Sequence, residues 1–302
     1  MGSARATDNG ILKKEDATMK LATFTAGGAP ELGIVKGESV LSLSRRAPAL
    51  APDMIALIAR WSALQRDVRA LADEPSTDFK LSDVRLLPPV PRPGKVFAIG
   101  LNYADHIAES KVPTPEQQVW FTKAATAASG PYDPIELTTP SFVDYEVELV
   151  VVIGQGGRRI ARTEANGAVF GYCVGNDVTE RLWQHRTPQW SLGKSFDTHA
   201  PFGPWLTTKD EVGNPHALDL VCSVNGEPRQ KSNTRNLVFN IFEQIEHLST
   251  AMTLEPGDLI FTGTPGGVGA AMEPRRFLKD GDRVRCEIAK LGVIENVCRA
   301  ET

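Results

Sequence analysis

The sequence predicts a mostly β protein of α+β type, with a small α/β unit at its N-terminal end. Three observations support this fold class. Short apolar segments separated by Gly, Pro and Asp turns dominate the chain after residue 92, residues 53–74 show helical spacing, and a proline-rich stretch lies between the two regions. The length of 302 residues suffices for one large domain or two smaller ones.

The first part of the chain divides into a polar leader and a compact unit. Residues 1–18 lack the apolar core of a signal peptide, so we interpret them as a disordered leader or tag. Residues 19–88 predict short strands with Gly-rich turns, and a helix whose apolar positions are Ile55, Ile58, Trp61, Leu64, Val68 and Leu71. Four prolines within residues 86–95 then form a semi-rigid connector, which predicts a boundary before a second domain at 92–302.

The second domain is predicted to consist of short strands with few helices. The strands are expected within residues 95–100, 145–154, 168–177, 219–226, 258–264, 282–292 and 293–299. The dipeptide Asn225-Gly226 after an apolar run predicts a tight hairpin turn. This pattern indicates a β sandwich or a barrel-like core.

Composition narrows the classes of function. The net charge is −4 and no basic cluster occurs, which argues against nucleic-acid binding. No apolar stretch approaches the roughly 20 residues of a membrane span. The four cysteines are widely separated without a C-x-x-C pair, so we expect reduced thiols in a cytoplasmic protein rather than a thiolate zinc site.

The stretch "DYEVELVVVIG" at residues 144–154 places Asp144, Glu146 and Glu148 at every second position, so a strand would direct all three carboxylates to one face. Asp177 follows the apolar segment "AVFGYCVGN", where a strand end would place it at a rim. Spacing alone leaves two alternatives open. The carboxylates either form a solvent-facing acidic strand, or they share a hard cation such as Mg²⁺ or Mn²⁺.

Other polar groups could carry chemistry or lie in solvent. His106 and Glu109 are neighbours on a helix face, as either a general base with its orienting carboxylate or a surface pair. Arg181, Gln184 and Lys194 could bind a carboxylate or stabilise an oxyanion, or carry ordinary solvated charge.

Three further features give no indication of a catalytic role. His185 and His199 have no spaced carboxylate partner, so we interpret both as ordinary histidines. "FTGTPGGVGA" lacks the lysine of a phosphate loop, which argues against nucleotide binding. Its amides and the Thr264 hydroxyl could still bind a carboxylate.

Taken together, these residues resemble the fumarylacetoacetate hydrolase family. The resemblance covers roughly residues 92–300, and its motifs occur in the family's order: "GLNYADH", "GPYDPI", "DYEVELVVVIG", "GYCVGNDVT", "QWSLGKSFDTHAPFGPW", "VNGEPRQ" and "GDLIFTGTPGGVG". It implies a mixed β-roll or distorted β-barrel catalytic domain, found as homodimers or higher assemblies.

The resemblance also implies a site. Its metal ligands would be Glu146, Glu148 and Asp177, holding Mg²⁺, with Mn²⁺ or Ca²⁺ as substitutes. Its catalytic groups would be the pair His106 and Glu109 on a lid helix, with Lys194 and Gln184 beside the metal. Its substrate-facing residues would be Arg181, Thr264, Gly263 and Tyr103, and Asp144 has no assigned role.

The implied activity is cleavage of a carbon–carbon bond in a 2,4-dioxo acid, in the manner of an acylpyruvase, giving pyruvate and a carboxylic acid. Two alternatives use the same metal and enolate: decarboxylation of oxaloacetate-like acids and isomerisation of 2-hydroxy-dienedioates. A dioxo-acid binding protein without catalysis is a rival from another class. The presence of His106, Glu109 and Lys194 argues against it.

Overall fold

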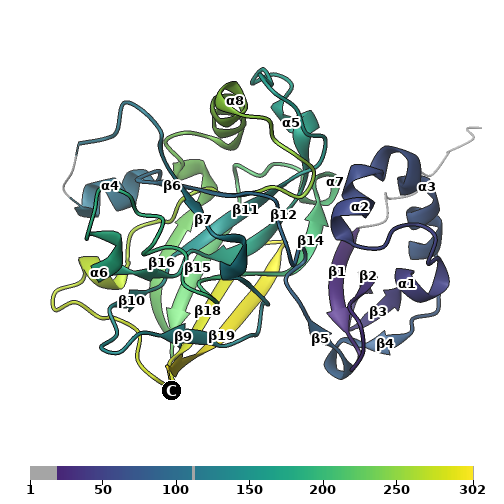
Figure 1. Ribbon diagram of the computed structural model, residues 1–302, viewed down its shortest axis with the longest axis horizontal. Coiled ribbons are helices and arrows are strands. Elements are labelled where there is room, and N and C mark those ends of the chain that lie inside the picture. Colours follow the sequence, from purple (N-terminus) through teal and green to yellow (C-terminus); the bar gives the residue numbers. More distant parts are fainter. Residues whose placement is uncertain (1–18, 111–112, 302) are drawn as a thin grey trace, which may run out of the picture.

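The computed structural model describes residues 19–110 and 113–301, and the predicted leader lies outside the described residues. The mostly β prediction is confirmed, because strands arranged in open sheets contribute more residues than helices do (Figure 1). The sheets do not close into a barrel.

One large sheet runs through the molecule. Its hydrogen-bonded order is β4 (Phe79–Lys80), β3 (Ser39–Ser42), β2 (Glu31–Lys36), β1 (Lys20–Thr25), β14 (Ala200–Thr208), β12 (Val169–Asn176), β11 (Val147–Ile153), β17 (Leu259–Phe261), β6 (Val96–Gly100) and β7 (Val119–Lys123). Two short strands join it at the side: β5 (Arg85–Leu86) on β1 and β8 (Ala128–Ser129) on β14. Because β1 pairs with β14, the N-terminal strands extend the central sheet.

A second sheet packs against the first. Its order is β16 (Glu227–Asn233), β15 (Asp219–Val224), β18 (Arg283–Ile288), β19 (Gly292–Ala300) and β9 (Ile135–Leu137). A two-stranded ribbon of β10 (Val143–Asp144) and β13 (Thr179–Glu180) lies beside the site described below.

Strand β11 is buried on both faces. Leu149 and Val151 belong to the core cluster shared with the second sheet, whereas Val150 and Val152 belong to the cluster shared with the N-terminal helices. Burial on both faces explains why this strand has an unbroken apolar run instead of alternation. It also fixes the register of the acidic residues at its start.

The N-terminal helical pattern forms two helices rather than one. They are α2 (Met54–Ala59) and α3 (Trp61–Ala72), which meet at Arg60, whose backbone (φ −105°, ψ 11°) ends α2 and caps α3. Ile58, Leu64 and Val68 are buried as predicted. These helices pack over the central sheet at the end of the molecule away from α4 and α6 (Figure 1).

The remaining helical segments are mostly single turns, as predicted. They are α1 (Leu43–Arg46), α4 (Ala104–Ser110), α5 (Ala165–Ala168), α6 (Arg181–Gln184), α7 (Lys209–Val212), α8 (Ile241–Ala251), η1 (Leu81–Asp83), η2 (Ala125–Ala127), η3 (Thr234–Asn236) and η4 (Gly269–Ala271). Helix α8 begins with a capping box in which Asn240 and Glu243 exchange hydrogen bonds with each other's backbone amides. No helix of the described residues has the length and apolar character needed to cross a membrane.

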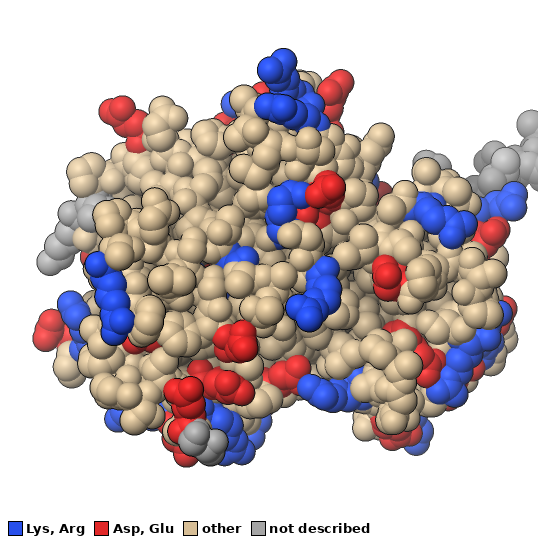
Figure 2. Space-filling view, in the orientation of Figure 1, with Lys and Arg blue, Asp and Glu red and all other residues tan. Residues whose placement is uncertain are grey.

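The surface carries charges of both signs. On the face shown in Figure 2, Lys and Arg side chains lie interspersed with Asp and Glu, and no continuous basic area covers that face. This agrees with the small negative net charge of the chain.

The predicted hairpin at Asn225-Gly226 is confirmed. It joins β15 to β16, and its two residues have φ of 53° and 80°. Positive φ at both positions is what a two-residue hairpin turn of matching twist requires. Glycine adopts this conformation without the steric penalty that a Cβ atom brings.

Replacing Gly226 by Ala should therefore destabilise the fold by about 1 kcal/mol, because the added Cβ is disfavoured at positive φ. The matched control is Gly167→Ala, which has an ordinary φ and no atom within 4 Å of the added Cβ. Chemical denaturation of both variants checks this. Equal stability of the two variants would contradict the turn assignment.

Candidate active site

Three carboxylates predicted to share a cation converge in the structure. Ligand oxygens of Glu146, Glu148 and Asp177 all lie within 4.8 Å of one another. Antiparallel pairing of β11 with β12 sets Glu148 opposite Gly175, which brings the end of β12 to the start of β11. All three side chains are buried. The solvent-facing alternative is therefore wrong, and the carboxylates form one internal cluster.

Buried cations partly compensate this cluster. Lys194 Nζ donates to Glu146 Oε2 (2.7 Å) and Asp177 Oδ2 (2.6 Å), and Arg181 Nη2 lies 2.7 Å from Glu146 Oε1. Burial opposes ionisation of Glu146, but Lys194 and Arg181 outweigh it and lower the pKa of Glu146 to about 2. Glu146 is therefore an anion throughout the neutral range.

Lys123 is a further member of the cluster that the sequence analysis missed. Its Nζ donates to Asp177 Oδ1 at 2.5 Å, and the ammonium is completely buried. Its burial follows the alternation of β7, where Phe121 and Lys123 are buried and Thr122 is exposed, a pattern that only the folded strand reveals. A lysine on the inward face of a strand needs a carboxylate partner, because an unpaired buried charge is costly.

Glu148 is the carboxylate left without a cation. Its Oε2 accepts a hydrogen bond from the Gly263 amide (2.7 Å), and among the described residues no Lys or Arg pairs with it. Burial and the neighbouring carboxylates of Asp177 and Glu146 raise its pKa. An oxygen-only donor set with one uncompensated buried carboxylate suits a hard divalent cation such as Mg²⁺ or Mn²⁺. The residues present thus fit the metal that the sequence predicts.

The structure brings the predicted His–Glu pair together on one helix. His106 and Glu109 lie on α4, with 3.5 Å between His106 Nδ1 and Glu109 Oε2. The Gly267 amide donates to both Glu109 oxygens at 3.0 Å. Burial opposes ionisation of Glu109, but hydrogen bonds from His106 and Gly267 lower its pKa below the ordinary value. The carboxylate therefore stays ionised and can accept a hydrogen bond from Nδ1–H, which leaves Nε2 as the base.

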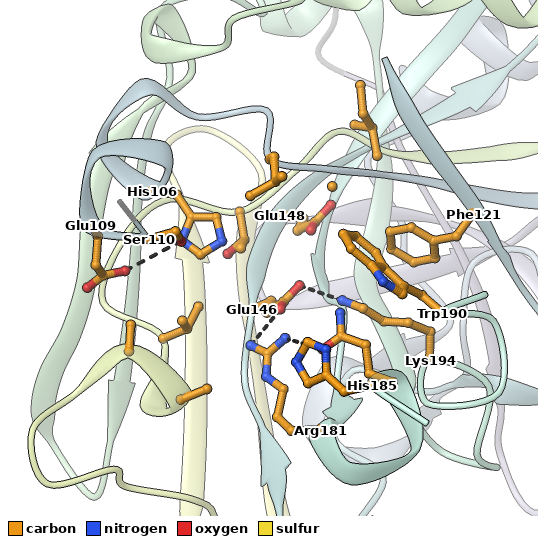
Figure 3. A pocket seen from close by; sticks show the side chains of 18 of the residues that line it. His106, Glu109, Ser110, Phe121, Glu146, Glu148, Arg181, His185, Trp190 and Lys194 are labelled. Atoms are coloured by element: carbon orange, nitrogen blue, oxygen red, sulfur yellow. Dashed lines mark hydrogen bonds and ion pairs between the residues drawn. The ribbon is translucent and has the colours of Figure 1, made fainter. Parts of the chain in front are cut away.

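Six groups of the site line one cavity of about 660 Å³: His106, Glu109, Glu146, Glu148, Arg181 and Lys194. Asp177 and Lys123 are buried beside it and lie outside its lining. Figure 3 shows His106 and Glu109 on one side, Lys194 and Phe121 on the other, and Glu146 and Glu148 between them. Other lining residues are Leu101, Ser110, Gln184, His185, Trp190, Thr264, Val268, Ala270, Ala271 and Glu273.

Only two of the four residues expected to face the substrate line the cavity. Arg181 and Thr264 line the cavity, although the Thr264 hydroxyl donates to the Val147 carbonyl (3.0 Å). Gly263 uses its amide for Glu148. Tyr103 is fully buried, its hydroxyl has no hydrogen-bond partner among the described residues, and it lies outside the cavity lining.

The two histidines that received no catalytic role have different positions. His185 lies at the cavity mouth and is part of the site, a position that its sequence spacing did not indicate. Burial and the nearby Arg181 lower its pKa. His199 lies outside the lining, is buried, and its Nε2 is 2.9 Å from the Glu136 carbonyl oxygen. Its other ring nitrogen has no partner among the described residues.

Comparisons to known proteins agree with the fold. The family model described as fumarylacetoacetate (FAA) hydrolase C-terminal matches residues 95–299. The chain is 45% identical over 285 residues to "Oxaloacetate tautomerase FAHD2A, mitochondrial" of Bos taurus, covering 92% of this chain and 91% of the relative.

Solved structures show the same likeness. One is maleylpyruvate hydrolase from Sphingobium sp. SYK-6 in complex with manganese(II) and pyruvate, at TM-score 0.80 and 36% identity. Another is 5-carboxymethyl-2-hydroxymuconate delta-isomerase from Mycobacterium smegmatis, at TM-score 0.74 and 31% identity. Each match covers 94% of this chain and 100% of the other.

The chain belongs to the fumarylacetoacetate hydrolase family. It is an enzyme of a family that includes hydrolases, isomerases and tautomerases, and its buried acidic cluster is a possible metal site.

The buried His199 leads to a prediction of how folding stability depends on pH. Burial lowers its pKa to about 4 from the ordinary 6.5, so the unfolded chain binds its proton more readily than the folded one. Folding stability should therefore fall as the pH drops from 6.5 towards 4, and His199 should contribute about 2 kcal/mol of this loss by pH 5.

Denaturant titrations at pH 7.5 and pH 5 check this prediction. His199→Gln should remove that part of the loss, while His247→Gln, at an exposed position on α8, should behave as the wild type. A loss in His199→Gln as steep as in the wild type would contradict the prediction.

Proposed function

We propose that this enzyme acts on enolisable 2-oxo acids with a bound divalent cation, and that proton transfer next to the 2-oxo group is its basic step. One observation carries the proposal. A His–Glu pair and a set of hydrogen-bond donors, Arg181, Gln184 and Lys194, face the same cavity beside the buried acidic cluster.

Glu146, Glu148 and Asp177 would hold the cation, with Mg²⁺ or Mn²⁺ as the expected ions. A bound divalent cation acts as a Lewis acid that polarises a carbonyl oxygen. Lys123 and Lys194 each donate to a different oxygen of Asp177, which fixes the orientation of that carboxylate.

The protein's own groups then move the proton. His106 Nε2 takes a proton from the carbon beside the 2-oxo group, and Glu109 stabilises the imidazolium that results. Negative charge develops on the 2-oxo oxygen. Lys194 has one N–H beyond its two carboxylate bonds, and Gln184 has its amide N–H groups, to stabilise that charge. Delivery of that proton to the 2-oxo oxygen completes conversion of the keto form to the enol, and the same steps in reverse convert the enol to the keto form.

Oxaloacetate tautomerisation is the first candidate reaction. It needs only this proton transfer, and relatives 44–45% identical over more than nine-tenths of this chain carry that name.

Carbon–carbon hydrolysis of a 2,4-dioxo acid, predicted from the sequence, is the second candidate. The same His106 could activate water for attack on the distal carbonyl, giving pyruvate and a carboxylic acid. A structural neighbour named as a maleylpyruvate hydrolase holds pyruvate, and the cavity of about 660 Å³ leaves room for an acyl group. Decarboxylation or isomerisation would use the same enolate.

A substrate panel with Mg²⁺ separates these reactions. Enol and keto oxaloacetate differ in ultraviolet absorbance, and release of pyruvate from acylpyruvates and from oxaloacetate can be followed in a coupled assay. We expect rapid enol–keto conversion of oxaloacetate above the buffer-catalysed rate. Pyruvate release from an acylpyruvate without tautomerisation would favour the hydrolase, and inactivity on the whole panel would contradict the proposal.

Glu148→Gln should weaken binding of Mn²⁺ by at least tenfold, because the substitution removes the carboxylate that no protein cation compensates. Calorimetry with the metal alone measures this effect. The control is Glu164→Gln, at an exposed position away from the cavity. Unchanged affinity in Glu148→Gln would remove it from the ligand set.

His106→Asn should reduce tautomerisation by about 10²–10⁴-fold, the usual contribution of a positioned acid–base group, and leave Mn²⁺ affinity unchanged. Initial rates with enol oxaloacetate measure the tautomerisation, and calorimetry with Mn²⁺ measures the metal affinity. His247→Asn serves as the exposed control. Near-wild-type rates in His106→Asn would show that another group transfers the proton.

The proposal also includes the oligomeric state of the protein and its cellular compartment. A homodimer is supported by large apolar side chains that stay exposed in α6 and the loop that follows it, Leu182, Trp183 and Leu192. A cytoplasmic location is supported by four buried, unpaired cysteines. Light scattering of the purified protein tests the dimer, and a mass of about 33 kDa would contradict it.

A further inference from the structure

Asp144 is the fourth carboxylate of the acidic stretch, and none of the roles proposed above uses it. It is completely buried, and three backbone amides donate to it. They are the amides of Tyr145 (3.0 Å), Gly269 (2.8 Å) and Ala270 (2.9 Å). These amides hold the carboxylate in one orientation, in which Oδ2 faces the guanidinium of Arg181.

Arg181 is almost fully engaged by protein groups. Its Nε (3.0 Å) and Nη2 (2.7 Å) donate to Asp144 Oδ2, Nη2 also lies 2.7 Å from Glu146 Oε1, and Nη1 donates to Gln184 Oε1 at 3.0 Å. A guanidinium carries five N–H groups in a fixed plane. Four are used, so a single Nη1–H remains for a ligand in the cavity that Arg181 lines.

The bond from Arg181 also determines how Gln184 presents its amide. Because Gln184 Oε1 accepts from Arg181, the amide nitrogen is the atom left for other partners. Among the described residues no acceptor binds that Nε2, and the buried Gln184 side chain lines the cavity. Both of its N–H groups are thus available to an oxygen of the substrate.

We propose that Asp144 is a positioning residue that presents Arg181 and Gln184 as a prearranged pair of donors to the substrate. This inference rests on the proposed function, since it concerns the donors of that same site. Without Asp144 the guanidinium would lose two of its four bonds and shift towards Glu146, its remaining anionic partner. Gln184 would then lose the donor that fixes its amide, and the metal ligand Glu146 would be more strongly neutralised.

A purely structural role is the alternative, because Asp144 also anchors the turn η4 through Gly269 and Ala270. A double-mutant cycle separates the two roles. If Asp144 acts through Arg181, removing Asp144 has little further effect once Arg181 is gone. If it acts by holding η4, the two losses multiply.

The test uses Asp144→Asn, Arg181→Met and the double variant, each loaded with Mn²⁺. Two quantities are measured: kcat/KM on the substrate that the panel identifies, and the affinity for pyruvate by calorimetry. Each single variant should lose about 100-fold in kcat/KM, the usual cost of an oxyanion donor, and should bind pyruvate more weakly. The double variant should lie within about threefold of Arg181→Met in both quantities.

Asp258→Asn is the matched control. Asp258 is equally buried, accepts from the amides of Lys95 and Glu255, and pairs with Lys95 Nζ at 3.0 Å, but it lies outside the cavity lining. It should lose thermal stability while keeping kcat/KM and pyruvate affinity. Asp144→Asn should instead lose kcat/KM and pyruvate affinity, in addition to any loss of thermal stability.

Losses that multiply in the double variant, or wild-type kcat/KM and pyruvate affinity in Asp144→Asn, would overturn the proposal. If Asp144→Asn does not fold, Asp144→Glu takes its place, because the longer side chain keeps the charge but displaces the guanidinium, and the same cycle applies. Wild-type enzyme that is inactive on the panel would contradict the proposed function instead. The pyruvate affinities still decide the role of Asp144 in that case.

Discussion

The site depends on the compensation of buried carboxylates by buried cations. Four carboxylates, Asp144, Glu146, Glu148 and Asp177, lie in contact with or beside three cations, Lys123, Arg181 and Lys194. With all seven groups ionised the net charge of the cluster is −1, and Glu148 is the carboxylate without a cationic partner. A bound divalent cation would change the net charge of the cluster to +1, which would favour the binding of an anionic 2-oxo acid.

The fold supplies the rigidity that such a cluster needs. Strand β11 is packed on both faces, so neither Glu146 nor Glu148 can turn away from its neighbours. The glycine-rich segment after β17 holds the other side by donating backbone amides to Glu148, Glu109 and Asp144. Residue 267 has φ of 101°, and a Cβ there would meet the Arg229 carbonyl oxygen at 2.0 Å. Only glycine allows the amide of residue 267 to approach Glu109 so closely.

Much of this arrangement could be predicted from local patterns. The period of two in "DYEVELVVVIG" and the position of Asp177 after an apolar strand indicated the acidic cluster, and the spacing of His106 and Glu109 indicated a shared helix face. Motif order then distinguished a metal site from a solvent-facing strand. The hairpin at Asn225-Gly226 followed from turn chemistry alone.

The rest depends on tertiary contacts that spacing does not encode. Lys123 meets Asp177 only because the fold brings β7 close to the end of β12, and the role of Asp144 appears only when Arg181 and η4 are placed around it. The break between α2 and α3 at Arg60 lies inside an uninterrupted apolar pattern without Gly or Pro, so no breaker residue signalled it. His185 reaches the cavity mouth through the short turn of α6, which has no periodic signal.

Anomalous X-ray diffraction from a crystal of the enzyme grown with Mn²⁺ tests the buried-charge cluster most directly. We predict one strong manganese peak bounded by oxygens of Glu146, Glu148 and Asp177, at about 2.2 Å, with Lys123 and Lys194 still bonded to Asp177. No peak among these carboxylates, or a manganese ion bound elsewhere while Glu148 stays unliganded, would contradict this assignment of the cluster.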